Sequence, residues 1–406
     1  MNYIRQFRHL PGNVRFFMLA LALWGIPNSL VSSYSTLYML EQGLTASQAG
    51  LISSICFIVK TILSFFAGYV INKLGRRATA GMIDLIGWGV YMFMLSQAQD
   101  FKMFLLAALV NCITTIGGVS TSCFMSEDVS REDRILAYNW TTIISSSCSF
   151  AAPLAGIFIS RYSLISAMRG LYLFACVSMS VSALCKLLLL KETSVGDKLK
   201  AEGNKIKNPF LQFPDIMRYV VVNKKLLVLL SMNILLNFAT NVNNLYYVPY
   251  LTEHLKFSKL MVSFFPFVTT IIGLVICFMV VPNINMVNGM ILSVILDTTG
   301  MLLLVGASFT CKELAYLCVI LKAVGTAMMG PLINTLIANN LKDELRTDVY
   351  GVFNTISMLC MFPAGYLGGT LFDISPLLLI IFVLLIYLAG CIVLLIVVRK
   401  IFPQMR

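Results

Sequence analysis

Charged residues are scarce in this 406-residue chain: they make up 12% of the sequence, against 58% hydrophobic residues. A soluble protein of this size could not keep so many apolar side chains from water. The composition therefore excludes a soluble globular protein and predicts an integral membrane protein. The net charge of +12 points to anionic lipid head groups as partners and not to nucleic acid, because the cations lie mainly in loops beside apolar spans.

The residues that build metal centres and catalytic sites are also few or scattered. Only two histidines are present, His9 and His254, and they are far apart in sequence. The eleven cysteines occur singly, mainly in apolar runs and without a Cys-x-x-Cys pair, which is typical of small packing residues. No nucleophile–base set, metal-ligand cluster or nucleotide-binding loop is found. We therefore expect a protein that is not an enzyme and that has neither a cofactor nor a metal.

Long apolar runs, by contrast, fill nearly the whole chain. A spanning helix needs roughly 20 apolar residues, and the first run is too long for a cleavable signal peptide. The sequence predicts an all-α integral membrane protein with twelve transmembrane helices. Their expected ranges are 16–40, 46–71, 80–98, 102–124, 136–160, 166–190, 224–250, 258–281, 286–309, 313–338, 350–372 and 376–400.

One long polar stretch, residues 191–223, divides the twelve spans into six and six. It predicts an N-terminal bundle at 1–190, a cytoplasmic linker loop, and a C-terminal bundle at 224–406. Within the linker, the segment 210–220 is expected either to lie on the membrane surface as an amphipathic helix or to be a mobile linker. About 21 Lys and Arg residues fall in the loops on the linker's side and about six in the opposite loops, which predicts two cytoplasmic termini in a plasma-membrane protein.

The two halves carry a weak internal repeat. Glu132-x-Arg134 after the fourth span recurs as Glu344-x-Arg346 after the tenth. Repeated six-helix halves place a substrate site at their interface near the bilayer midplane. These loop charges are expected to latch the cytoplasmic face, or else to be solvated charges that only set the topology.

A short basic turn between the second and third spans carries the most specific motif, Gly68-x-x-x-Asn72-Lys73-x-Gly75-Arg76-Arg77. Its glycines are expected to let helices pack closely. The motif resembles the loop between helices 2 and 3 of the major facilitator superfamily, with Asn72 standing where that family usually has Asp.

The resemblance implies two pseudo-symmetric six-helix bundles that transport by alternating access. It also implies a gating role for the turn, in which the family's acid helps to lock the two halves together on the cytoplasmic side, aided by a helix N-terminus. The neutral amide of Asn72 predicts a weaker latch, because it gains less from the helix dipole.

Charges inside spans are costly unless they face water or a partner. Lys60 and Lys322 lie near the middles of their spans, and the resemblance implies that Lys322 faces the central cavity. Lys60 is expected to contact a ligand or water. Lys322 is expected either to do the same or to form a structural pair with Asp297. Asp84 and Asp297 are the candidates for carrying a coupling proton or Na⁺, and Lys186 is expected to reach the head groups.

The seventh span has the densest polar pattern: Asn233, Asn237, Asn241 and Asn244 share one helix face and are followed by Tyr246 and Tyr247. Amides donate and accept, so such a stripe suits a hydroxyl-rich or zwitterionic solute; the alternative is that the amides join helices. Weaker candidates for solute contact on other spans are Trp24, Asn28, Asn111, Asn139 and Asn354.

We therefore expect a monomeric secondary active transporter of a small polar organic solute, either neutral and hydroxylated or anionic. One alternative is a proton-driven drug exporter. Another, from a different class, is a membrane sensor or assembly protein that does not transport.

Overall fold

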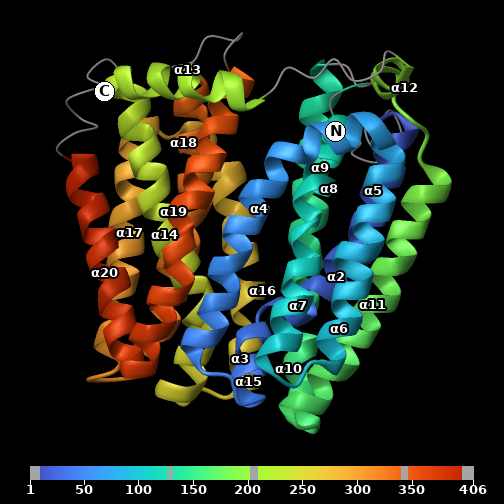
Figure 1. The fold of residues 1–406 in the computed structure, drawn as a ribbon. Helices are drawn as coiled ribbons and strands as arrows, with labels where there is room; N and C mark the ends of the chain where they lie inside the picture. Colours follow the sequence, from blue (N-terminus) through green and yellow to red (C-terminus); the bar gives the residue numbers. More distant parts are fainter. Residues whose placement is uncertain (1–9, 126, 128–130, 202–208, 340–345, 396–406) are drawn as a thin grey trace. The chain divides into compact units, whose positions relative to one another are not determined.

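The computed structural model describes residues 10–125, 127, 131–201, 209–339 and 346–395 (Figure 1). Within these ranges the chain is helical, without a strand, and twelve helical stretches are long and apolar enough to cross a membrane. The prediction of an all-α protein with twelve spans is therefore confirmed. Helices satisfy all their backbone hydrogen bonds within one segment, which is what a lipid environment requires.

By their contacts, the residues fall into two compact units. Unit 1 consists of Met1–Leu44 and Ile58–Lys207, and unit 2 of Thr45–Phe57 and Asn208–Arg406. The long helix α4 (Ala46–Leu74) therefore begins in unit 2 and continues into unit 1.

The other helices of unit 1 are α2 (Gly12–Ser32), α3 (Ser35–Glu41), α5 (Arg76–Asp84), η1 (Leu85–Val90), α6 (Tyr91–Gln97), α7 (Phe101–Cys112), α8 (Thr114–Phe124), α9 (Arg131–Cys148), η2 (Ser149–Ala151), α10 (Ala152–Arg161), α11 (Leu164–Leu189) and α12 (Ser194–Ala201). Helix α11 packs along α2, α5 and α6. A buried cluster that includes Phe17, Met18 and Phe124 fills the space near the start of α2. Unit 1 thus has an apolar core beside the loop that joins α4 to α5.

The remaining helices of unit 2 are α13 (Pro209–Val222), α14 (Lys224–Pro249), η3 (Tyr250–His254), α15 (Lys259–Ser263), α16 (Phe265–Val275), η4 (Ile276–Val280), η5 (Val281–Asn283), α17 (Met286–Ala307), α18 (Leu314–Asn339), α19 (Arg346–Ile374) and α20 (Pro376–Val393). Helices α17 and α18 pack closely along their length, and glycines make this approach possible. A Cβ on Gly325 would lie 2.6 Å from Asp297 Oδ1, and one on Gly300 would lie 2.9 Å from Lys322 Cγ.

Helix α13 lies across the end of the spanning helices of unit 2 and packs against α14 and α19 (Figure 1). Residues 209–222 of the predicted linker form a helix. Whether this helix lies on a membrane surface stays a prediction.

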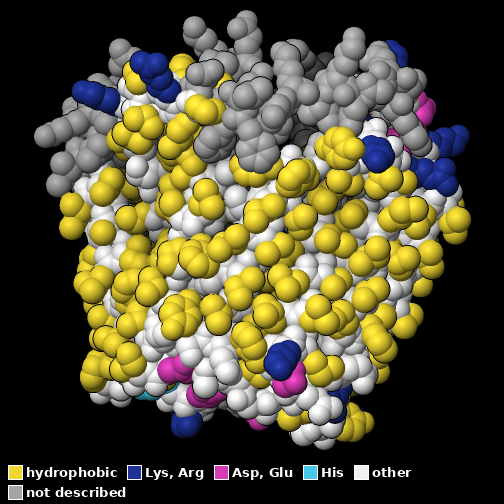
Figure 2. Space-filling model, viewed as in Figure 1, with side chains coloured by type: hydrophobic (Ala, Val, Ile, Leu, Met, Phe, Trp, Pro, Cys, Tyr) yellow, Lys and Arg dark blue, Asp and Glu magenta, His cyan; other side chains and the backbone are white. Residues whose placement is uncertain are grey.

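Hydrophobic side chains cover the middle of the helices on the face shown in Figure 2, and charged side chains lie near the helix ends. Exposed apolar residues include Leu188 at 75%, Met279 at 68% and Val177 at 65% exposure. A water-soluble protein rarely exposes a continuous apolar surface of this kind. These side chains are suited to contact with lipid.

Candidate functional site

The basic turn between α4 and α5 is held inside unit 1 by buried charge contacts. Gly75 has φ +89°, a conformation that residues with a Cβ rarely adopt. Arg76 follows it and is 4% exposed, and its Nε and Nη2 donate to the Glu127 carboxylate at 3.0–3.3 Å. Its Nη1 donates to Asn72 Oδ1 at 2.9 Å. These hydrogen bonds and this ion pair therefore anchor the turn within unit 1.

A second carboxylate, that of Glu192, lies at the N-terminus of α5. Its oxygens accept hydrogen bonds from the backbone N–H of Arg76 at 2.8 Å and of Arg77 at 3.2 Å. A negative charge there satisfies unpaired N–H groups and gains from the helix dipole. Thr193, next in sequence, donates its hydroxyl proton to Glu127. The sequence reasoning missed these three residues, although an acidic residue directly after an apolar span is a recognisable signal.

The other predicted gating residues have mixed outcomes. The expectation of close packing at Gly68 is wrong for the described residues, because a Cβ there would meet nothing within 4 Å. Lys73 is exposed, with its ammonium 5.8 Å from the Tyr69 ring centre. The side chains of Glu132, Arg134, Glu344 and Arg346 lie outside the described residues, so the latch assigned to them stays a prediction.

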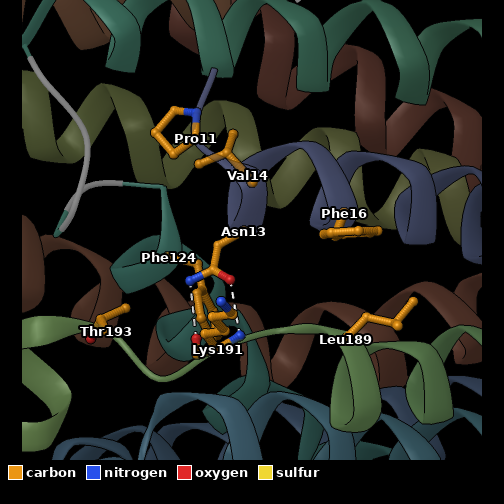
Figure 3. A pocket seen from close by; sticks show the side chains of 9 residues that line it. Pro11, Asn13, Val14, Phe16, Phe124, Leu189, Lys191 and Thr193 are labelled. Carbon is orange, nitrogen blue, oxygen red and sulfur yellow. Dashed lines mark hydrogen bonds between the residues drawn. The ribbon is translucent and has the colours of Figure 1, made fainter. Parts of the chain in front are cut away.

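A pocket of about 340 Å³ opens beside this network, between the start of α2 and the connection from α11 to α12 (Figure 3). Asn13 closes one side of it: its Nδ2 donates to the Lys191 carbonyl at 3.0 Å and its Oδ1 accepts from the Lys191 N–H at 2.9 Å. None of the residues predicted to bind a solute lines this pocket.

The two candidate coupling acids differ sharply in their surroundings. Asp84, on α5, forms a salt bridge with Lys186 of α11, whose ammonium also lies 4.7 Å from the Phe17 ring centre. Lys186 is 6% exposed. The expectation that it reaches the head groups is therefore wrong, because a carboxylate in the neighbouring helix offers a closer partner.

Asp297 is buried in α17 at 4% exposure, and it has no salt bridge with a described residue. Among the described residues, it accepts one long hydrogen bond, from the Thr326 hydroxyl to Oδ1 at 3.5 Å. Lys322 lies on the adjacent α18, but its ammonium donates to Met301 Sδ at 3.2 Å and lies 5.2 Å from the Tyr387 ring centre. The two charges are thus near neighbours without a direct ion pair, and the predicted pair is not formed in this arrangement.

The amides on α14 are partly engaged with one another. Asn237 Nδ2 donates to the Asn233 carbonyl at 2.7 Å and to its side-chain oxygen at 3.0 Å, and Ser357 of α19 donates to the same side-chain oxygen at 3.4 Å. Asn237 and Asn244 are exposed, and Asn241 is half-buried. These amides can therefore still reach a solute.

The two tyrosines after the amides do not lie on an open surface. Tyr246 is fully buried, and its hydroxyl contacts the Gly365 carbonyl at 2.9 Å and the Ala46 carbonyl at 3.1 Å. This corrects its predicted role from solute contact to helix packing. The Tyr247 hydroxyl is buried and has no hydrogen-bond partner among the described residues.

The weaker candidates also separate into packing and accessible residues. Asn111 Nδ2 donates to the Gly87 carbonyl at 2.8 Å, so it supports the π-helical turn η1. The Trp24 ring lies edge-on to Trp88 with centroids 5.1 Å apart, and its buried Nε1 has no acceptor among the described residues. Asn28 is half-buried, Asn354 is exposed, and the side chain of Asn139 lies outside the described residues.

Lys60 lies near the midpoint of α4 and is half-buried. Among the described residues it has neither a hydrogen-bond nor an ion-pair partner. A cation at this depth needs water or an anionic group. Of the charged side chains described within the spans, it is thus the one most available to a ligand.

Comparison with solved structures supports the same architecture. The chain is similar to a mutant of the nucleoside transporter NupG, with a TM-score of 0.72 and 16% identity over 97% of this chain and 100% of that one. It is also similar to the human organic anion transporter MFSD10 (TM-score 0.63, 15% identity, 97% and 100% covered). A third similar structure is the xylose transporter XylE from E. coli in an inward open conformation (TM-score 0.64, 18% identity, 93% and 94% covered).

No curated protein matches the chain. The family model described as Major Facilitator Superfamily, however, matches residues 14–365, most of the chain's length. Together with the twelve spans and the turn at residues 68–77, this match shows that the chain belongs to the Major Facilitator Superfamily of alternating-access secondary transporters.

Proposed function

We propose that this transporter moves a small polar organic solute that is either neutral and hydroxylated or anionic. The observation that carries the proposal is that the acids within the spans are paired or buried, whereas a lysine within the spans is not. Asp84 is neutralised by Lys186 and Asp297 is buried, whereas Lys60 has no protein partner among the described residues. An ammonium group without an ion-pair partner favours a solute that is anionic or rich in hydrogen-bond acceptors.

The exposed amides of Asn237 and Asn244 add donors and acceptors suited to hydroxyl groups. The similar structures include transporters of nucleosides, xylose and organic anions, which is the same range of chemistry. A drug exporter for lipophilic cations is favoured less, because it would need an accessible, unpaired acid, whereas Asp84 is paired with Lys186 and Asp297 is buried.

For coupling, we propose a proton carried by Asp297. Asp84 is the weaker candidate because its carboxylate already binds the Lys186 ammonium. Among the described residues, Asp297 has only the long contact from Thr326, and Lys322 is close enough to respond to its charge. The remaining parts of the proposal are a monomer in the plasma membrane with both termini in the cytoplasm.

The test is uptake by purified protein in liposomes, measured over a panel of nucleosides, sugars and organic anions with and without a pH gradient. We expect accumulation of at least one of these solutes to follow the gradient. Lys60→Gln should raise the KM for that solute about tenfold or more. A lost charge-assisted hydrogen bond of about 1.5–3 kcal/mol sets that scale. Lys102→Gln, which changes an exposed lysine at the start of α7, is the matched control.

Asp297→Asn should abolish the response to the pH gradient while downhill exchange of the solute continues. Transport of lipophilic cations alone would contradict the solute class. Binding of a solute without uptake in any condition would indicate a sensor and not a transporter.

A further inference from the structure

The pocket beside the start of α2 lies wholly within unit 1 and contains none of the residues predicted to bind a solute. Its volume of about 340 Å³ falls in the range of roughly 300–1,000 Å³ that is usual for small-molecule sites. Asn13 joins its two walls, because the Asn13 amide bonds both the N–H and the carbonyl of Lys191 (Figure 3). The first turn of α2 and the connection from α11 to α12 are thus tied together at the pocket.

One side of the pocket carries an unpaired positive charge. Lys191 is exposed, and its ammonium has neither a hydrogen bond nor an ion pair with a described residue. The nearby carboxylates have other partners: Glu192 accepts from the N–H groups of Arg76 and Arg77, and Glu127 is paired with the Arg76 guanidinium. The charge of Lys191 therefore remains available to an anion.

Backbone donors of α2 add to this polar side. Pro11, which precedes the helix, gives it no side-chain cap, and the first backbone bond into the helix is from the Arg15 N–H to the Pro11 carbonyl at 3.1 Å. The N–H groups of Gly12, Asn13 and Val14 thus have no acceptor among the described residues, and these three residues line the pocket. Unsatisfied N–H groups at a helix start favour an anionic oxygen.

The other side of the pocket is apolar and open to the surroundings. Phe16 is 45% exposed and Leu189 is 50% exposed, and Figure 3 shows both on the same side of the pocket. Leu188, next in sequence, is 75% exposed. Buried Val14 and Phe124 complete the lining from the apolar core. The exposed apolar surface of α2 and α11 therefore continues into the pocket.

We propose that this pocket binds an anionic phospholipid, with its phosphate against Lys191 and the start of α2 and an acyl chain against Phe16 and Leu189. A free phosphate would use only the polar side. A zwitterionic lipid would bring a cation as well, for which Glu127 and Glu192 are not free. The pocket lies at the start of the Lys- and Arg-rich stretch 191–223, and such basic segments attract anionic lipid.

The test is a binding titration of the delipidated full-length protein in detergent, followed by native mass spectrometry. The probes are phosphatidylglycerol, phosphatidylcholine with the same acyl chains, and inorganic phosphate. We expect one molecule of phosphatidylglycerol to bind about tenfold or more tightly than either of the other two. No transported solute is needed, so the result is independent of the proposed function.

Lys191→Ala should raise the Kd for phosphatidylglycerol about tenfold or more, the scale of one lost charge-assisted contact. The matched control is Lys198→Ala, which removes an exposed lysine from the neighbouring α12, outside the pocket, and should leave the Kd within about twofold of the wild-type value. Phe16→Ala should weaken binding through the apolar side, whereas Leu19→Ala, which truncates an exposed residue of α2 outside the pocket, should not.

Three results would overturn the proposal. Equal affinity for the two lipids would mean that the pocket does not select an anionic head group. Equal losses in the Lys191 and Lys198 variants would mean that net charge alone attracts the lipid. Inorganic phosphate that binds as tightly as phosphatidylglycerol would mean that the pocket is a site for a free anion.

Discussion

Two glycines of the same turn should respond in opposite ways to substitution by alanine. At Gly75, φ is +89° and an added Cβ would overlap the Glu192 carboxylate. Backbone strain in this region costs roughly 1–3 kcal/mol. Displacing Glu192 also weakens two charge-assisted bonds to the start of α5, each worth about 1.5–3 kcal/mol.

Together these terms predict that Gly75→Ala destabilises unit 1 by about 3 kcal/mol or more. For a unit of about 200 residues, this corresponds to a fall of roughly 6–12 °C in the unfolding midpoint. The assay is thermal unfolding of the purified protein in detergent, followed by intrinsic fluorescence and by loss of the monodisperse peak in size-exclusion chromatography.

Gly68→Ala is the matched control. It lies within helix α4, and a Cβ there meets nothing within 4 Å among the described residues. Alanine is preferred to glycine inside a helix by up to about 1 kcal/mol, so this variant should unfold at the same temperature or slightly higher. The reasoning is refuted if Gly75→Ala unfolds within about 2 °C of the wild type, or if the two variants lose equal stability.

Two further predictions concern Lys186 and Cys123 in unit 1. Lys186→Met leaves the Asp84 carboxylate without its cation and should lower the free energy of unfolding by about 3–5 kcal/mol. The double variant with Asp84→Asn should recover most of this stability. Equal thermal unfolding midpoints for the single and double variants would contradict the pairing. Burial and the nearby Glu127 raise the pKa of the Cys123 thiol to about 11, so about one part in a thousand is thiolate at pH 8. Maleimide labelling followed by peptide mass spectrometry should therefore find the half-buried Cys123 at least 100-fold slower than the exposed Cys311, and comparable rates would contradict the raised pKa.

The spanning helices could be predicted closely from the sequence, because a bilayer requires long apolar segments with internally satisfied backbones. The interrupted helices could not. The π-helical turn η1, for example, lies inside an apolar run whose hydropathy does not show which carbonyl Asn111 will bond. The partners of the charged residues were predicted less well, and Lys186 shows why. Its position near a span end suggested contact with head groups, whereas its carboxylate partner is 102 residues away in sequence.

By itself, then, the sequence determined the class of protein, the number of spans and the family motif, since these depend on composition and on spacing along one segment. The tertiary structure alone decided which charges are paired and which remain available. It placed Glu192 at the start of α5, Asp373 at the start of α4 and Lys186 beside Asp84, and it left Lys60 without a partner among the described residues. The physical reason is that a hydrogen bond or ion pair acts over a few ångströms, and only the packing of helices brings residues distant in sequence within that range.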